Sequence, residues 1–307
     1  MALDGRQLAI TRERLGRVGV WLGSLRAAPM DDVRSAARRI EALGYGSLWT
    51  GEAVGGREAF AFQGVLLSAT DRLVTGTGIA NLWARHPYAM EGGATTLGEA
   101  YPGRFVLGVG VSHAPMVDSR GMDYAKPLRR MREYLDGMDA AAADHPPDAD
   151  AWPPVPRLLA ALRPGMLQLA AERADGAHPY FVPVDHTPLA RAALGPGKLL
   201  VPEQAVVVDT DPATARATAR RHMELYLQLP NYVRNLRHLG YGDQDLAAPG
   251  SDRLVDAIVA WGDPETVARR VTEHLEAGAD HVLVQPLGRL PNALAQLEAL
   301  APELLGS

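Results

Sequence analysis

Three side chains that can take up or release a proton stand beside predicted strands of this sequence. Glu52 ends the segment 47–52, His113 follows the segment 104–112, and His178 begins the segment 178–183. Burial can raise a carboxyl pKa until the group donates a proton, and imidazole titrates near neutral pH. We therefore predict Glu52, His113 and His178 as catalytic acid–base groups. The alternatives are a structural carboxylate at Glu52, bonded to the turn at residues 55–57, and structural roles for the histidines.

A second group of residues has the pattern of an anion site. Arg163, Pro164 and Gly165 connect an apolar run to a helical pattern. Proline suits the first helical position, and the free amides of a helix N-terminus bind phosphate. The glycines of the segment 104–112 and its final Ser112 are small enough to admit a cofactor close to the backbone. The alternative is a set of ordinary turns, which use proline and glycine in the same way.

These residues require elements that bring them to one place. Eight short, mostly continuous apolar runs alternate with helical patterns, as expected of parallel strands that are buried on both faces. The runs are residues 17–23, 47–52, 74–82, 104–112, 157–162, 178–183, 203–209 and 281–287. We predict one (β/α)8 barrel domain over residues 1–307, whose site lies at the C-terminal ends of the strands. The alternative is an open doubly wound sheet, but no G-x-G-x-x-G turn follows the first run.

Two insertions are predicted, one after strand four and one after strand seven. Residues 114–156 contain a helical pattern at 128–138 and then an Ala-, Asp- and Pro-rich tract that indicates a surface loop. Residues 212–261 are rich in helical patterns. We interpret this second segment as the last crossover helix with a lid-like extension.

Composition and charge exclude several classes of protein. The absence of cysteine rules out disulfides, thiolate catalysis and cysteine-bound metals. The net charge is −5 and no block of like charge occurs, so we predict neither nucleic acid nor an anionic membrane as a partner. No apolar run reaches the roughly 18 residues of a membrane span, and the cytoplasm is the predicted location. No metal-ligand spacing, serine-hydrolase elbow or Walker loop is found, and we predict no metal.

Three stretches in combination resemble a known family. They are VTGTGIAN at residues 74–81, YPGRFVLGVGVS at 101–112 and LAALRPGMLQLAAERADG at 159–176. Together they resemble the luciferase-like monooxygenase superfamily and, within it, the branch of oxidoreductases that use the deazaflavin coenzyme F420. The resemblance extends over residues 17–287 and implies a (β/α)8 barrel with an isoalloxazine-type ring in its mouth.

The resemblance also implies which residues hold the cofactor. It places a cis peptide bond between Gly78 and Ile79, as a bulge behind the ring, and the phosphate between the segments after strands four and five. The implied cofactor-binding residues are Gly78, Ile79, Asn81, Val111, Ser112, Arg163, Pro164 and Gly165. One departure is Ala53, which follows Glu52 where luciferase-type members often carry histidine. This departure weakens the interpretation as an oxygenase.

We interpret the chain as an enzyme that transfers a hydride between coenzyme F420 and an unidentified small organic substrate. One alternative is an FMN-dependent luciferase-like monooxygenase, and another is a barrel that binds a cofactor without catalysis. The resemblance further implies a homodimer. The helical residues that we predict to contribute to its interface are Phe60, Val65, Leu66 and Met90.

Overall fold

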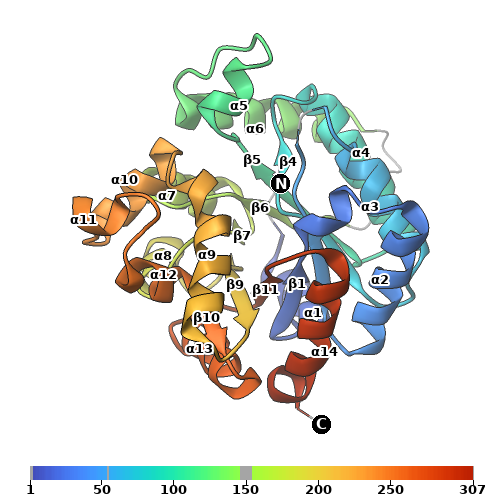
Figure 1. The fold of residues 1–307 in the computed structure, drawn as a ribbon. Coiled ribbons are helices and arrows are strands. Elements are labelled where there is room, and N and C mark those ends of the chain that lie inside the picture. The colour runs from blue at the N-terminus through green and yellow to red at the C-terminus, as the bar shows by residue number, and fades with distance from the viewer. Residues whose placement is uncertain (1–2, 54, 146–153, 307) are drawn as a thin grey trace.

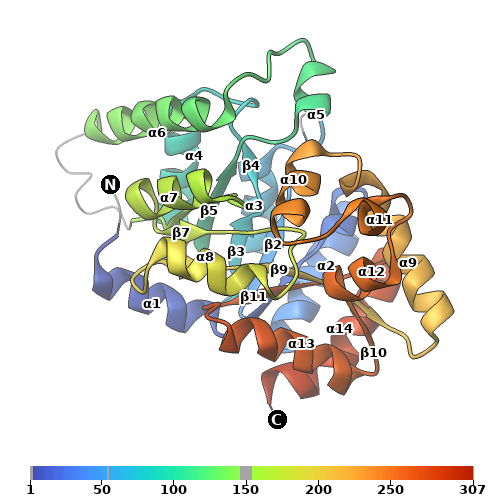
Figure 2. The ribbon, with the colours of Figure 1, turned by 90° about the vertical axis from the view of Figure 1, so that its left-hand side faces the viewer.

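Short parallel strands form the centre of the fold, and helices surround them (Figures 1 and 2). The computed structural model describes residues 3–53, 55–145 and 154–306. The strands are β1 (Val18–Trp21), β2 (Ser47–Thr50), β3 (Val74–Thr77), β4 (Ala80–Asn81), β5 (Phe105–Gly110), β6 (Arg157–Leu159), β7 (Gly176–Ala177), β8 (Leu199–Leu200), β9 (Glu203–Val208), β10 (Val259–Gly262) and β11 (Val282–Pro286).

Helices connect most of the strands. They are α1 (Gly5–Leu15), α2 (Met30–Ala42), α3 (Ala59–Ser68), α4 (Pro87–Ala100), α5 (Ala114–Asp118), α6 (Pro127–Ala143), α7 (Pro164–Arg173), α8 (His186–Leu194), α9 (Pro212–Tyr226), α10 (Pro230–His238), α11 (Asp243–Leu246), α12 (Asp252–Ile258), α13 (Pro264–Glu276) and α14 (Leu290–Leu305). A short 3-10 helix, Gly23–Arg26, follows β1.

The ring of strands closes through residues 199–208. β8 pairs with β7, and the same segment continues past Pro202 as β9, which pairs with β11. The amide of Val201 donates to the carbonyl of Ala177 at 2.9 Å, and the amide of Leu283 donates to the carbonyl of Pro202 at 2.9 Å. β11 then pairs with β1, so the first and last strands are neighbours. The predicted (β/α)8 barrel is confirmed, with β3 and β4 as its third strand and β8 and β9 as its seventh.

Large apolar side chains fill the inside of the ring. Trp49 of β2, Val106 of β5 and Leu283 of β11 belong to one buried cluster. Leu8 and Leu15 of α1 join the same cluster and close it at the N-terminal end of the strands. A barrel packed in this way is a solid core rather than a channel, which leaves the C-terminal ends of the strands as the place for a site.

Helix boundaries follow from local sequence. In α13 the side chain of Asp263 accepts a hydrogen bond from the amide of Thr266 at 2.8 Å, and Pro264 takes the first helical position. Val267 and Val271 are buried against the strands. Capping, a fixed φ at the start and an apolar stripe on one face therefore agree on this helix.

Three details of the predicted elements are wrong. The sixth strand is Gly176–Ala177 rather than residues 178–183, because Phe181 has a φ of 58° and the chain has already turned. The segment 212–261 ends in a strand, β10, which pairs with β9 at the edge of the ring. The crossover into β11 is α13, which lies after this segment.

The two long segments come together through α5 and α10, which Figure 2 shows near each other. The helical pattern at 128–138 lies within α6. The loop predicted for residues 139–156 is wrong at its start, because α6 continues through residue 143. Residues 146–153 of that tract lie outside the described residues. The imidazole of His113, which precedes α5, is bonded to Asn231 of α10, so the two segments meet directly.

Candidate active site

A cavity of about 220 Å³ opens at the C-terminal ends of the strands. Seven of the residues predicted from the sequence line it, and they come from positions after β2, β3, β5 and β7. They are Glu52, Gly78, Ile79, Val111, Ser112, His113 and His178. The fold therefore gathers residues that are 126 positions apart into one site.

The wall formed by Gly78 is fitted closely to its neighbours. The Gly78–Ile79 peptide bond is cis, as the resemblance implies. The indole Nε1 of Trp21 donates a hydrogen bond to the carbonyl of Gly78 at 3.0 Å. A Cβ atom on Gly78 would lie 2.5 Å from that Nε1 and 3.1 Å from Nε2 of His178. Only glycine fits this position without displacing Trp21.

His178 lies beneath this wall and is fully buried. Its Nδ1 is 2.7 Å from the carbonyl oxygen of Val201, which can only accept, so Nδ1 carries the proton. Nε2 is then a bare acceptor, and no described group bonds to it. Burial lowers the pKa of His178 to about 4, although the bond to Val201 opposes the shift. The imidazole is therefore neutral at pH 7.

His113, which also lines the cavity, is held in the same tautomer. Its Nδ1 lies 3.1 Å from Oδ1 of Asn231, again an acceptor, which leaves Nε2 as the basic nitrogen. Its ring packs on Tyr232, with 5.2 Å between centroids. Burial lowers the pKa of His113, and the bond to Asn231 opposes this. Unlike His178, the side chain is only partly buried.

Glu52 is bound by three donors within the protein. Its carboxylate accepts from the amide of Asn81 at 2.7 Å and from the amide of Ala59 at 3.3 Å. It also forms an ion pair with Arg85. The side chain is 4 % exposed and that of Arg85 is 9 % exposed. These bonds favour a structural role for Glu52, in which its carboxylate fixes the segment after β4, and they do not favour a role as a proton donor. The partners differ from the turn at residues 55–57 that the sequence suggested.

The other predicted cofactor contacts lie outside the cavity. Asn81 is buried, and its Oδ1 accepts from the amide of Trp83 at 3.0 Å. Arg163, Pro164 and Gly165 are exposed and begin α7 directly after Leu162, a residue that does line the cavity. No side chain caps this helix. Pro164 has no N–H and the amide of Met166 donates to the carbonyl of Arg163 at 3.0 Å, so the amide of Gly165 is the one in this turn that can bind an anion at the edge of the mouth.

An aromatic group covers the remaining side of the cavity, and most of it was not predicted. Tyr180 donates to Oε1 of Gln285 at 2.9 Å and lies 2.8 Å from the hydroxyl of Tyr226. Because Tyr180 has one proton, Tyr226 is the donor in the second bond. Tyr226 and Tyr232 come from α9 and α10. Both lie in the segment 212–261, which the sequence predicted only to be rich in helical patterns.

Glu203 lies below this aromatic group, near its tyrosines. It is 1 % exposed, and its Oε2 accepts from the amide of Phe181 at 3.1 Å. Its Oε1 has no partner among the described residues. Burial raises the pKa of Glu203 to about 8, against the effect of the Phe181 amide. The carboxyl is therefore protonated in the folded chain at pH 7.

Among the described residues, no group of three or more His, Asp or Glu side chains is placed to hold a metal ion. None of the helices in the described part of the chain is long and apolar enough to cross a membrane.

The fold and the site define a (β/α)8 barrel with a ring-sized cavity at the C-terminal ends of its strands. The family model described as luciferase-like monooxygenase matches residues 15–281, and the chain belongs to that family.

Individual proteins agree with this assignment. A Mycobacterium tuberculosis protein described as a coenzyme F420-dependent oxidoreductase is 27 % identical over 87 % of this chain and 94 % of its own. The structure of an F420-dependent secondary alcohol dehydrogenase, in complex with an F420–acetone adduct, is similar with a TM-score of 0.75. It is 17 % identical and covers 94 % of this chain and 98 % of that one.

A second similar structure is that of a monooxygenase. It is the oxygenating constituent of 3,6-diketocamphane monooxygenase from Pseudomonas putida, in complex with FMN. Its TM-score is 0.69 at 17 % identity, over 94 % of this chain and 97 % of that one. At these identities the two structures show the fold alone.

Proposed function

We propose that this protein is an oxidoreductase that transfers a hydride between coenzyme F420 and a small organic substrate. The observation that carries the proposal is that Gly78, His113 and His178 line one cavity at the barrel mouth. The relative described as F420-dependent covers most of the chain and supports this cofactor. Ala53, in place of the histidine common at luciferase-type sites, supports hydride transfer rather than oxygenation.

The residues of the cavity fit a flat heterocyclic ring. The backbone at Gly78 and the rings of Trp21 and Tyr180 provide flat surfaces, and these two rings lie 5.2 Å apart. The amide of Gly165 and the positive end of the α7 dipole fit a phosphate group beside the mouth. We propose that Val111 and Ser112 complete this contact from the end of β5. When bound, the deazaflavin supplies a carbon that gives or takes the hydride.

We propose that His113 moves the proton that accompanies the hydride. Its Nδ1 is fixed by Asn231, so its Nε2 accepts a proton from a hydroxyl or amine of the substrate. As that proton leaves, the substrate C–H bond breaks and its electron pair goes with the hydride. In the reverse direction the imidazolium returns the proton. The lowered pKa of His113 keeps the neutral, proton-accepting form in the majority at pH 7.

We propose that His178 and Glu52, the other two predicted catalytic groups, hold neighbouring groups in place and do not transfer the proton. His178 presents a neutral acceptor nitrogen beside Gly78, which suits an N–H donor or an ordered water. Glu52 holds the amide of Asn81 and the guanidinium of Arg85, which fixes the chain after β4. The side chain of Asn81 lies outside the cavity. We propose that Asn81 contributes to cofactor binding by placing this segment beside the edge of the ring.

A direct comparison of two cofactors tests the proposal. Fluorescence-quenching titrations with F420 and FMN at matched salt should show at least about tenfold tighter binding of F420, a difference that one or two hydrogen bonds can supply. Reduced F420 should then be consumed with a carbonyl or alkene substrate panel. Tighter FMN binding with oxygen consumption would replace the proposal with the monooxygenase alternative. Tight F420 binding without turnover across the panel would favour the non-catalytic barrel.

A homodimer, which the family resemblance implies, and a cytoplasmic location, which the sequence pattern predicts, both remain proposals. Of the four residues suggested for the interface, Leu66 and Met90 are fully buried inside the chain and cannot contribute. Phe60 and Val65 are partly exposed on α3 and stay candidates. Light scattering at micromolar concentration measures the oligomeric state, and a monomer mass would count against the dimer.

A further inference from the structure

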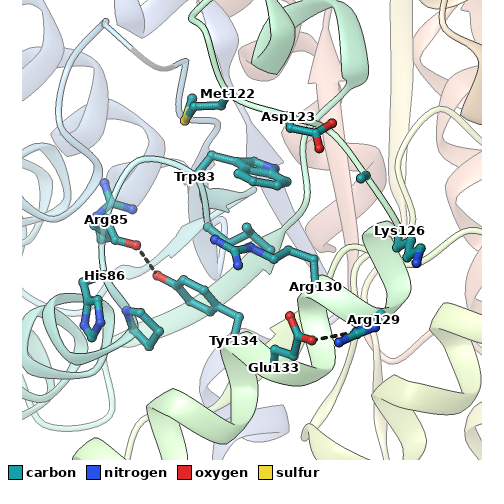
Figure 3. A pocket seen from close by; sticks show the side chains of 13 residues that line it. Trp83, Arg85, His86, Met122, Asp123, Lys126, Arg129, Arg130, Glu133 and Tyr134 are labelled. Atoms are coloured by element: carbon teal, nitrogen blue, oxygen red, sulfur yellow. Dashed lines mark hydrogen bonds and ion pairs between the residues drawn. The ribbon is translucent and has the colours of Figure 1, made fainter.

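A second and larger cavity of about 810 Å³ lies beside the active-site cavity. Figure 3 shows that its walls are the segment after β4 and the first turns of α6. Four cationic side chains line it, together with two acidic ones. The cations are Arg85, Lys126, Arg129 and Arg130, and the acids are Asp123 and Glu133.

The positive charges in this cavity are only partly neutralised. Arg85 is paired with Glu52 and Glu58, and Arg129 is paired with Glu133 at 2.7 Å. Within the described chain, neither Lys126 nor Arg130 forms an ion pair. Asp123, the remaining acid of the cavity, is bonded to neither of them. Two exposed cations therefore face the cavity with unused hydrogen-bond donors.

The guanidinium of Arg130 lies over the indole of Trp83, with 5.1 Å between its carbon and the ring centroid. The indole Nε1 is bonded to the carbonyl of Val111 at 2.9 Å, and Val111 lines the active-site cavity. Trp83 therefore stands between the two cavities and holds Arg130 at the edge of the second one. A ligand that binds Arg130 must change the surroundings of this indole.

The backbone adds to the positive potential. α6 is a helix of 17 residues without a side-chain cap or an acidic residue in its first turn. Acidic residues are favoured at that end of a helix, yet Lys126, Arg129 and Arg130 occupy it here. A Cβ atom on Gly165 would lie 3.3 Å from Cδ2 of Leu128, so the uncapped start of α7 packs against the start of α6. An anion would relieve the repulsion among these charges.

We propose that this cavity binds a ligand with several negative charges, held by Lys126 and Arg130 and reaching toward the start of α7. Such a ligand carries carboxylate or phosphate groups on one flexible molecule. Two sources can supply it: the acidic part of the redox cofactor, or a separate small acid. The first source rests on the proposed function and the second does not.

The binding test uses the whole chain with two probes, inorganic pyrophosphate and the peptide Glu-Glu-Glu, at low salt. Quenching or enhancement of tryptophan fluorescence reports binding, and Trp83→Phe should remove the signal. The double variant Lys126→Ala/Arg130→Ala should bind about a hundredfold more weakly, at about tenfold for each charged contact. Both side chains are exposed, so the variant should fold normally.

The matched control removes the same charge elsewhere. Arg38 and Arg72 are exposed, lie outside both cavities and form no ion pair within the described residues. Arg38→Ala/Arg72→Ala should bind the probes with an affinity within about twofold of the parent chain, since distant surface charges are screened. Equal affinity of the parent and the Lys126→Ala/Arg130→Ala protein, or no binding of either probe at low salt, would overturn the inference.

A competition experiment separates the two sources. If the cofactor is the source, intact F420 should displace the peptide, whereas the deazaflavin fragment without phosphate and acidic chain should not. If a separate acid is the source, the peptide should bind equally well with intact F420 present. Should F420 fail to bind at all while the probes depend on Lys126 and Arg130, the proposed function would fail and the anion site would stand.

Discussion

Arg85 and Glu52 form an ion pair whose two ends face different cavities. Glu52 lines the cavity at the barrel mouth, and Arg85 lines the larger cavity beside α6. Arg85 is held further by Glu58, and the hydroxyl of Tyr134 donates to its carbonyl at 2.8 Å. Because both charged groups are nearly inaccessible to water, the pair is a strong constraint on the wall between the cavities.

Removing Arg85 should destabilise the fold. Arg85→Ala leaves the buried carboxylate of Glu52 without its charged partner, and we expect a loss of about 3–5 kcal/mol in the free energy of unfolding. Glu58→Ala is the control, because its side chain is 52 % exposed and its loss should cost at most about 1 kcal/mol. Denaturant unfolding measures both. Equal losses in the free energy of unfolding would show that the buried ion pair contributes no more to stability than the exposed one.

Gly78→Ala should weaken cofactor binding. The new methyl group would collide with Nε1 of Trp21 and displace the ring from the carbonyl of residue 78. We expect the affinity for F420 to fall by about tenfold or more. Gly92→Ala on α4 is the control, since no atom lies within 4 Å of its added Cβ. If Gly78→Ala binds the cofactor as tightly as Gly92→Ala, this wall does not contact the ring.

Gly165→Glu should weaken cofactor binding without loss of stability. A carboxylate in the first turn of α7 repels a phosphate held by its amides, but it is favourable for the helix itself. Gly197→Glu is the control at an exposed turn with no atom within 4 Å of the added Cβ. Calorimetry with F420 measures the affinities. A folded Gly165→Glu protein with unchanged affinity would place the phosphate elsewhere.

Glu203→Gln should make the protein more stable at alkaline pH. The folded pKa is about 8 against an ordinary value of 4.5, so the wild-type chain loses stability as pH rises from 4.5 through 8. A neutral glutamine removes this loss, which amounts to about 1.4 kcal/mol per pH unit in that range. Unfolding at pH 5 and pH 8 tests the sign, with the exposed Glu276→Gln as control. A variant that gains nothing between pH 5 and pH 8 would contradict the buried, protonated carboxyl.

Acid should destabilise the fold well before the carboxylates are protonated. Burial lowers the pKa of His178, His222 and His281 to about 4 and that of His274 to about 3. The unfolded chain binds these protons near pH 6.5, so the histidines' contribution to stability is complete above that pH and is lost as pH falls toward 4. Unfolding midpoints at pH 7, 6, 5 and 4 measure the slope. A flat profile between pH 7 and pH 5 would argue against neutral buried histidines.

The sequence predicted most of the barrel because parallel strands buried on both faces leave continuous apolar runs. β2, β3 and β5 lie inside the predicted segments for this reason. β7 was misplaced because it has two residues and the apolar run beginning at His178 is longer. β10 was missed because its four residues directly follow the helix α12.

The sequence predicted which residues line the site, but it did not predict their hydrogen-bond and ion-pair partners. A barrel brings the ends of its strands together, so Glu52, His113 and His178 could be expected in one cavity from their places in the chain. Their partners could not be expected, because they depend on side-chain directions in segments far apart. Arg85 and Asn231 carry no sequence signal that links them to Glu52 and His113. These partners decide which nitrogen accepts a proton and which carboxylate is already occupied.

The pairing of β1 with β11 joins residues near the two ends of the chain, with Val18 opposite Val282. During synthesis one edge of β1 therefore has no partner until most of the chain has left the ribosome. Such distant contacts are formed late, and an open strand edge invites pairing with other chains in the meantime. We therefore expect the completion of this barrel to depend on how well that edge is shielded in the nascent chain.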